Sequence, residues 1–262
     1  MCGIIAIVRR RPTREAPTTE EIKAALPDLE GSLVGDARAI NGLAEQFEAL
    51  DRALSGVPGV TCLLRDPALV ALVAHCCEGT NDAIASLEAW LHRGQGSEDS
   101  APIDAALVRL KDAVWSIGRD RLRTAEEVGR LCQGVMTAGA VEAYLSVQES
   151  LSAIDRLEVR GRDSAGLHLL VRGHALDLED AGVADEIGRR GADPNFGSGS
   201  VREADGHLGF VYKAAAEIGE LGDNTRAIRQ AILDDDLLRR ALANDTASAT
   251  LLGHTRWASV GI

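Results

Sequence analysis

The residue best suited to chemistry in this sequence is Cys2, which follows the initiating methionine. Its side chain is small enough for an aminopeptidase to remove Met1, and removal would leave a thiol and a free α-amine on one residue. That amine has an unperturbed pKa of roughly 7.7–8.0, so much of it can act as a base near neutral pH. Because nucleophile and base then come from one residue, the sequence predicts an N-terminal cysteine nucleophile. The plainer interpretation is an ordinary buried cysteine.

Two segments far along the chain carry further candidate residues. Residues 156–166 read RLEVRGRDSAG, and residues 253–258 read GHTRWA. Arg256 suits a planar carboxylate, because a guanidinium donates two parallel hydrogen bonds that a lysine does not match; taken alone, it would be interpreted as part of a surface ion pair. His254 invites a catalytic triad with Cys2, although the α-amine already supplies the base.

Together with the start MCGIIAIV, these segments resemble the glutaminase domain of the N-terminal-nucleophile (Ntn) glutamine amidotransferases. RLEVRGRDSAG is similar to the family segment R-L-E-Y-R-G-Y-D-S-A-G, and GHTRWA to its segment H-T-R-W-A. Three segments in the same order point, within this class, to the glucosamine-6-phosphate synthases, also called glutamine–fructose-6-phosphate aminotransferases.

The resemblance implies a role for each matching position. Cys2 would attack the side-chain amide of glutamine, forming a thioester and releasing ammonia. Arg256 would bind the glutamine α-carboxylate, and its neighbours would line the same pocket. Residues of the RLE segment would lie beside the nucleophile, where an arginine can brace the fold as well as touch substrate. The implied substrate-binding positions are Arg256, Thr255, Trp257, Arg160 and Gly161.

The resemblance also implies partners and missing parts. Glutamine would be the substrate, and a longer parent protein, expected to be a homodimer, would pass the ammonia to fructose 6-phosphate, without a cofactor or a metal ion. Family glutaminases continue to an Asn-Gly pair that forms the oxyanion hole and to an aspartate that holds the substrate amine. Both elements would follow Ile262, the last residue of the given sequence. We therefore expect a fragment with little glutaminase activity, since losing one oxyanion donor costs about 10²–10³ in rate.

The elements that would position these residues are of two kinds. Residues 3–8 form a short apolar run that predicts a strand buried on both faces. Residues 165–171 and 249–254 predict two more strands, and residues 207–212 a weaker one. We expect an α/β protein with a partial Ntn-hydrolase glutaminase fold, in which antiparallel sheets are flanked by helices. We also expect a helix capped by Asn224 and ending near Leu242. Residues 182–206 predict a surface loop.

A long helical tract separates the first strand from the rest. Apolar residues recur at steps of three and four, and breaks at residues 56–59, 94–102 and 134–139 predict four or five packed helices. The family pattern has no counterpart to this tract. We interpret residues 19–145 as an all-helical insertion between residues 1–18 and residues 146–262. Its role is either a lineage-specific elaboration or a partner or regulatory surface.

Composition narrows the classes of function. The net charge of -12 and the lack of a dense run of Lys or Arg argue against nucleic acid as a partner. No apolar run is long enough to span a bilayer, and the N-terminus lacks the order of a signal peptide, so we expect a cytoplasmic protein without a membrane partner. The five cysteines include no Cys-x-x-Cys pair. The cluster from His75 to Cys77 is interpreted as buried thiols on a helix rather than a metal site.

Two alternatives remain beside the leading interpretation. One keeps the glutaminase but changes the ammonia acceptor, as in the relatives that make phosphoribosylamine, asparagine or glutamate; the two motif segments favour fructose 6-phosphate. The other is an interaction protein, in which the helical tract binds a partner and a glutaminase remnant serves as its scaffold.

Overall fold

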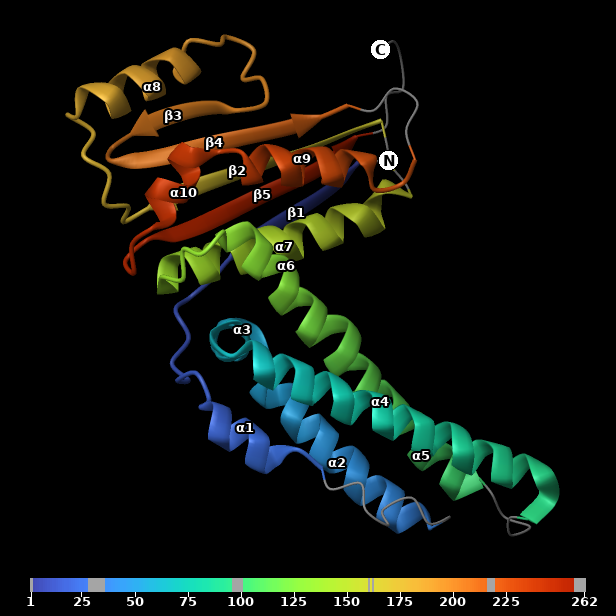
Figure 1. Ribbon diagram of the computed structural model, residues 1–262. Helices are drawn as coiled ribbons and strands as arrows, with labels where there is room; N and C mark the ends of the chain where they lie inside the picture. Colours follow the sequence, from blue (N-terminus) through green and yellow to red (C-terminus); the bar gives the residue numbers. More distant parts are fainter. Residues whose placement is uncertain are drawn as a thin grey trace. The chain divides into compact units, whose positions relative to one another are not determined.

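The computed structural model describes residues 2–27, 36–95, 101–159, 161, 163–215 and 220–256 (Figure 1). The chain divides into two compact units. One comprises Pro12–Glu127, and the other combines Met1–Arg11 with Val128–Ile262. We call them the helical unit and the sheet unit. The chain passes from one to the other twice, first after Arg11 and then after Glu127, within the helix α6 (Arg123–Cys132).

The helical unit is built from helices whose apolar stripes form one core. On α2 (Ala37–Ala53), the apolar residues that recur at steps of three and four, Phe47 among them, are buried. The corresponding residues of α5 (Ala101–Trp115), Leu110 among them, are buried as well. This confirms the helical periodicity of both segments. The elements are α1 (Thr19–Ala25), α2 (Ala37–Ala53), α3 (Gly56–Arg65), α4 (Pro67–Trp90), the π-helical η1 (Leu91–Gln95), α5 (Ala101–Trp115) and the π-helical η2 (Ser116–Leu122).

One predicted break in this unit is wrong. Residues 56–59 do not separate two helices; they begin α3, and the chain turns just before them. A Cβ atom on Gly59 would lie 2.0 Å from the backbone of Leu54, so glycine lets the new helix start against the end of the previous one. A further break, not predicted, lies at Asp66, whose carboxylate accepts hydrogen bonds from the first turn of α4.

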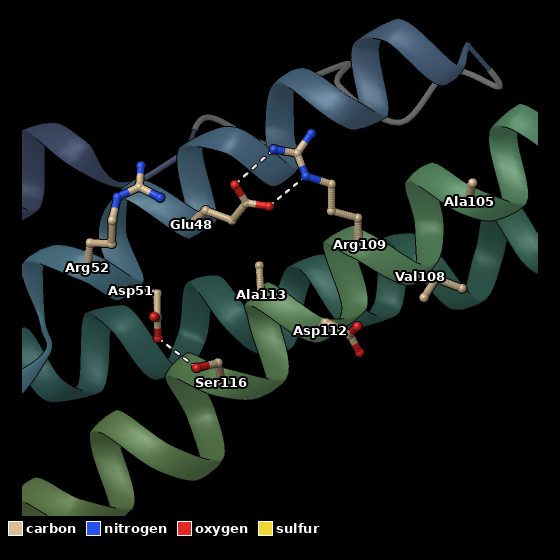
Figure 2. Close-up of a pocket in the computed structure, with 9 residues that line it drawn as sticks. All are labelled: Glu48, Asp51, Arg52, Ala105, Val108, Arg109, Asp112, Ala113 and Ser116. Carbon is tan, nitrogen blue, oxygen red and sulfur yellow. Dashed lines mark hydrogen bonds and ion pairs between the residues drawn. The ribbon is translucent and has the colours of Figure 1, made fainter.

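Ion pairs and a hydrogen bond join α2 to α5 and η2, and Figure 2 shows the contacts made by Arg109 and Ser116. Arg109 donates from Nε to Glu48 Oε1 at 2.6 Å and from its second terminal nitrogen to Oε2 at 2.8 Å. Asp51 accepts from Ser116 at 2.7 Å and from Arg121 at 2.9 Å. Glu48, Asp51, Arg109 and Ser116 line a groove of about 470 Å³, and the contacts among them link its walls.

In the described part of the chain, no single helix is both long and apolar enough to cross a bilayer. The pair Gly56–Arg65 and Pro67–Arg93 reaches that length and apolarity only together, with a bend of 108° between its members.

The sheet unit contains a five-stranded antiparallel sheet in the order β1-β5-β2-β4-β3. All four predicted strands are present, so the α/β class is confirmed. The strands are β1 (Gly3–Val8), β2 (Ser164–Arg172), β3 (Ser200–Ala204), β4 (His207–Ala214) and β5 (Ser248–Arg256), and the remaining helices are α7 (Ala138–Glu158), α8 (Ala181–Gly191), α9 (Asp223–Leu233) and α10 (Asp236–Leu242).

Two local predictions in this unit are wrong. The predicted loop at residues 182–206 contains α8 and β3. Asp180 caps α8, and Val183 of that helix is buried. The cap and this buried side chain stabilise a helix in spite of the glycines in the segment. The predicted helix up to Leu242 is two helices, and α9 is capped by Gly222, which has φ +91, rather than by Asn224. Asp235 begins the second helix by accepting from the Leu238 N–H.

The inserted tract is shorter than expected at its C-terminal side. The expected boundaries lay at residues 18 and 145, whereas the compact units divide after Arg11 and after Glu127. The reason is α7, whose residues from Gly139 to Gln148 are all buried. This helix packs on β5 and β1, so it belongs to the sheet unit.

The two faces of the sheet differ. α7 and α9 cover one face, where Leu167 and Phe210 are buried. On the other face, which we call the open face, Ile4 is 81% exposed, Val8 75% and Leu252 52%. β1 alternates between half-buried and exposed positions, so the prediction of a strand buried on both faces is wrong for the described part of the protein.

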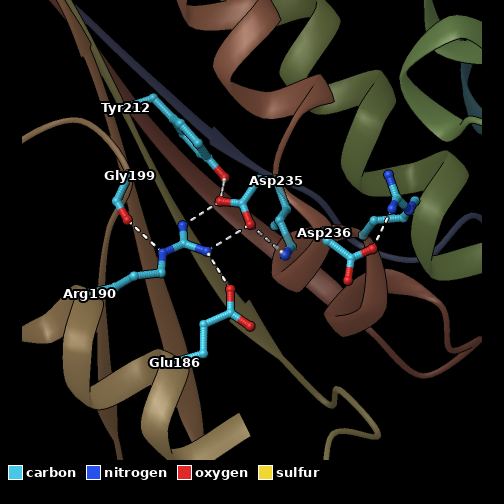
Figure 3. Close-up of polar contacts among 8 residues, drawn as sticks. Glu186, Arg190, Gly199, Tyr212, Asp235 and Asp236 are labelled. Carbon is cyan, nitrogen blue, oxygen red and sulfur yellow. Dashed lines mark hydrogen bonds and ion pairs between the residues drawn. The ribbon is translucent and has the colours of Figure 1, made fainter. Parts of the chain in front are cut away.

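A buried polar network ties α8 to β4 and α10 (Figure 3). Arg190 donates to both carboxylate oxygens of Asp235, one of them at 2.9 Å, and from Nε to the Gly199 carbonyl at 2.7 Å. The Tyr212 hydroxyl donates to Asp235 at 2.8 Å. Burial alone would raise the pKa of the Asp235 carboxyl, but the bonds from Arg190, Leu238 and Tyr212 lower that pKa below its usual value.

We expect Asp235→Asn to lower the free energy of unfolding by about 3 kcal/mol, because it removes the buried carboxylate that accepts two hydrogen bonds from the half-buried, charged Arg190. Exposed Asp234 provides the control: Asp234→Asn should change that free energy by less than about 0.5 kcal/mol. Urea unfolding at pH 7 measures both, and equal stability of the two variants would contradict the role given to the network.

The same pair predicts a pH dependence. The pKa of Asp235 in the folded protein lies below its unfolded value of about 3.9. Its contribution is therefore complete above about pH 4 and is lost as the pH falls through the folded pKa. The stability difference between wild type and Asp235→Asn should shrink when unfolding is followed below pH 4.

Candidate functional site

Three segments that are far apart in sequence meet at one end of the sheet. β1 begins there, β5 ends there and β2 begins there (Figure 1). Gly3 pairs with Thr255 in the antiparallel register, and Ser164 pairs with Arg256. The Asp163 N–H also donates to the Arg256 carbonyl at 3.2 Å. The sheet therefore brings together the surroundings of Cys2, the RGRDSAG segment and the HTR segment.

Cys2 and Arg256 extend this end of the sheet side by side. Cys2 directly precedes Gly3 and Arg256 directly follows Thr255, so the two flank the last pair of the β1–β5 ladder. Both are exposed. Side chains alternate along a strand, which places Arg256 on the open face with His254; continuing the β1 alternation by one residue places Cys2 on that face with Ile4.

Cys2 differs from the other cysteines in its exposure. All five are free thiols, and Cys2 is the exposed one. Burial raises the pKa of the Cys62 and Cys76 thiols, and it raises the pKa of Cys77 and of Cys132 to about 12. Because the thiolate is the reactive form, these four remain poor nucleophiles at neutral pH.

Thr255 lies on the other side of the sheet from Arg256. Its side chain is 1% exposed, on the face that the helices cover. Its Oγ1 accepts a hydrogen bond from the Gly3 N–H at 3.2 Å. The expected position of Thr255 in the substrate pocket does not fit this geometry, which places Thr255 on the covered face behind Cys2.

Gly3 is closely packed from the same side. A Cβ atom there would lie 2.7 Å from Leu157 Cδ1 and 3.0 Å from Thr255 Oγ1. Leu157 is the second residue of the RLE segment and comes from the last turn of α7. The three motif segments are thus in contact around the residue that follows Cys2, and the absence of a side chain at Gly3 permits it.

Two later residues of the RLE segment, Glu158 and Gly161, are both buried. Gly161 is buried and donates its N–H to the Glu158 carbonyl at 3.1 Å. Glu158 is 1% exposed, and its Oε2 accepts from the Gly222 N–H at 2.7 Å, at the start of α9. Sequence reasoning missed this contact, because nothing local signals that Glu158 meets a helix more than sixty residues later. Arg160 and Trp257 lie outside the described residues.

A groove of about 400 Å³ adjoins this end of the open face. Ile4 and Leu252 line it together with two histidines. The His254 ring occupies the space above Gly166, and the His168 ring occupies the space above Gly209. Burial lowers the pKa of His168, so its neutral form is favoured. Sequence reasoning missed His168; its alternation with buried leucines along β2 was the available signal.

Comparisons with protein family models, with curated proteins and with solved structures found no match to this chain. Within the described ranges, no group of three or more His, Cys, Asp or Glu side chains is placed to hold a metal ion.

The packing around Gly3 predicts how it responds to substitution. Gly3→Ala should lower the free energy of unfolding by about 1–3 kcal/mol, because the added methyl group overpacks against Leu157. Gly253→Ala is a matched control on the same covered face, since a Cβ there meets Ile154 at 3.3 Å. It should cost less than Gly3→Ala in urea unfolding, and the reverse order would show that Gly3 is not the tighter position.

Proposed function

We propose that this chain is the glutaminase part of a glutamine amidotransferase, with Cys2 as its N-terminal nucleophile after removal of Met1. The observation that supports this proposal is the shared end of β1, β2 and β5. Pairing of Gly3 with Thr255 and of Ser164 with Arg256 brings an exposed thiol and an exposed guanidinium to adjacent strand ends. Cys2 and Arg256 lie near opposite ends of the sequence, so the pairing of β1 with β5 brings them together rather than their positions along the chain.

In the proposed reaction, the free α-amine of Cys2 accepts the thiol proton as the sulfur attacks the side-chain amide carbon of glutamine. The proton then passes to the leaving nitrogen, the carbon–nitrogen bond breaks, and ammonia departs from a thioester. Water gives a proton to the same amine as its oxygen attacks the thioester carbon. The carbon–sulfur bond then breaks, glutamate is released, and the protonated amine returns the proton to sulfur. An amide nitrogen is not basic, so retention of Met1 would block the first step.

Arg256 is proposed to hold the α-carboxylate of glutamine. Its side chain is exposed at the open-face side, where it can present two parallel donors to a carboxylate. Such a contact fixes the substrate at one end while Cys2 attacks the other. Trp257 and Arg160 remain proposed substrate-side residues, and Gly161 a residue that shapes the loop beside them.

We further propose that the sheet unit is one layer of an Ntn-hydrolase fold, in which a second antiparallel sheet covers the open face. The support is the apolar character of that face, with Ile4 and Leu252 exposed beside the groove. Surfaces of this kind in soluble proteins mark contacts with other structure. A second layer would also enclose the groove next to Cys2.

Fructose 6-phosphate is the proposed ammonia acceptor, in a longer homodimeric protein that forms glucosamine 6-phosphate. The support is the pair of segments RGRDSAG and HTRW, in which Asp163 and Ser164 meet Arg256 at the candidate site. In such a protein, Cys2→Ala should abolish sugar amination with glutamine and preserve it with free ammonia.

In that longer protein, processed Cys2 should react covalently with 6-diazo-5-oxo-L-norleucine, a glutamine analogue whose diazo carbon stands where the amide nitrogen would be. The diazo carbon takes the thiol proton, the Cys2 sulfur bonds to that carbon, and dinitrogen leaves. Mass spectrometry of the labelled peptide should place the adduct on Cys2, L-glutamine should slow the labelling, and D-glutamine should not. Labelling of Cys2→Ala at the wild-type rate would overturn the proposal.

Arg256→Lys should weaken the protection that L-glutamine gives by about tenfold or more, because a bidentate charged contact is lost. Arg172, exposed at the opposite end of β2, supplies the matched control. Arg172→Lys should leave the protecting concentration of glutamine unchanged. Equal protection in both variants would remove Arg256 from the substrate site.

A further inference from the structure

Thr255 contributes to the candidate site through the backbone rather than through substrate. Its hydroxyl oxygen accepts the Gly3 N–H at 3.2 Å, across 252 residues of sequence. The side chain is 1% exposed and faces the helices, while its neighbour Arg256 is exposed. The hydrogen bond therefore forms on the covered side of the sheet, directly behind the position of Cys2.

The peptide held by this bond is the one that joins Cys2 to Gly3. A peptide unit is planar, so fixing its N–H also fixes the orientation of the preceding carbonyl and Cα. Leu157 packs against Gly3 from α7 and closes the space on the same side. A chain end that is not held in this way frays, and its side chain samples many directions.

This arrangement matters because Cys2 would carry both reacting groups on one Cα atom. The thiol and the α-amine rotate together when the Cys2–Gly3 peptide moves. Small displacements of a reacting group, on the order of 1 Å, can cost about 10²-fold in rate. A fixed peptide plane therefore sets where the sulfur meets the amide carbon of a bound substrate.

We infer that Thr255 is a positioning residue for Cys2: its hydroxyl holds the Cys2–Gly3 peptide so that sulfur and α-amine keep their reactive orientation. The inference rests on the proposed function, because it assigns Thr255 a part in the glutaminase reaction. In this role Thr255 does not need to contact substrate. The role also accounts for a buried threonine between the exposed residues His254 and Arg256.

The test compares Thr255→Val, which keeps the shape and removes the acceptor, with Thr255→Ser, which keeps the hydroxyl. Thr250→Val is the matched control, since Thr250 lies on the same strand at the opposite end of the β1–β5 ladder. Each processed protein is labelled with 6-diazo-5-oxo-L-norleucine over a range of concentrations. This yields a maximal labelling rate and a half-saturating concentration.

Thr255→Val should lower the maximal labelling rate of Cys2 by about tenfold or more, with the half-saturating concentration within about threefold of wild type. Thr255→Ser should restore the rate to within about threefold, and Thr250→Val should match wild type. A merely structural role would instead weaken binding of the analogue. Alkylation of Cys2 by iodoacetamide, which needs no orientation, should change by less than about twofold.

The outcomes separate this inference from the function beneath it. A wild-type labelling rate in Thr255→Val, with labelling still dependent on Cys2 and slowed by glutamine, overturns the positioning role and leaves the glutaminase standing. Labelling that neither needs Cys2 nor responds to glutamine overturns the function itself. Hydrogen exchange of the wild-type Gly3 amide gives a result without any variant: exchange as fast as in an unstructured peptide would exclude the bond.

Discussion

The antiparallel pairing of β1 with β5 is the interaction on which the candidate site depends. It joins residues at the two ends of the described chain, and its last pair, Gly3 with Thr255, is reinforced by a side-chain hydrogen bond. Without this ladder, Cys2 would be the tip of a free terminus, and Arg256 would be the end of an unrelated strand. The proximity of Cys2 and Arg256 follows from this shared register.

The sheet separates two tasks by face. The covered face supplies rigidity, through Leu157 on Gly3, Ile154 on Gly253 and the Glu158 contact to the start of α9. The open face carries the exposed side chains and the groove beside them. Because strand side chains alternate, neighbouring residues of one motif serve different tasks: Thr255 stabilises, and the next residue, Arg256, is available to bind.

The helical unit is interposed in sequence between β1 and the rest of the sheet unit, yet it has a core of its own. That core includes the stripes of α2 and α5. Ion pairs outside the core, such as Arg109 with Glu48, also join these two helices. The entropy cost of a long connection grows only slowly with its length, so a self-contained insertion is compatible with the β1–β5 pairing.

Much of the local structure could be predicted from sequence. Periodicity identified the apolar stripes of α2 and α5 and four of the strands, because these signals depend on residues a few positions apart. It failed where a single contact decides: Gly59 against Leu54, Asp180 at the start of α8, and Asp235 dividing the last helical segment. Each depends on one cap or one close approach, which a pattern averaged over many residues does not report.

The sequence by itself determined the reactive inventory of the site: a thiol next to the chain start, a guanidinium in an HTR segment, and the strands beside them. Only the tertiary structure decided which of these residues meet, and that Thr255 faces away from Arg256. It also decided that Leu157 and Glu158, both on α7, brace the site, Glu158 through its contact with Gly222 at the start of α9. The physical reason is that contacts across more than sixty residues of chain set the strand register and the docking of the helices. Local propensity depends on neighbouring residues and does not report such contacts.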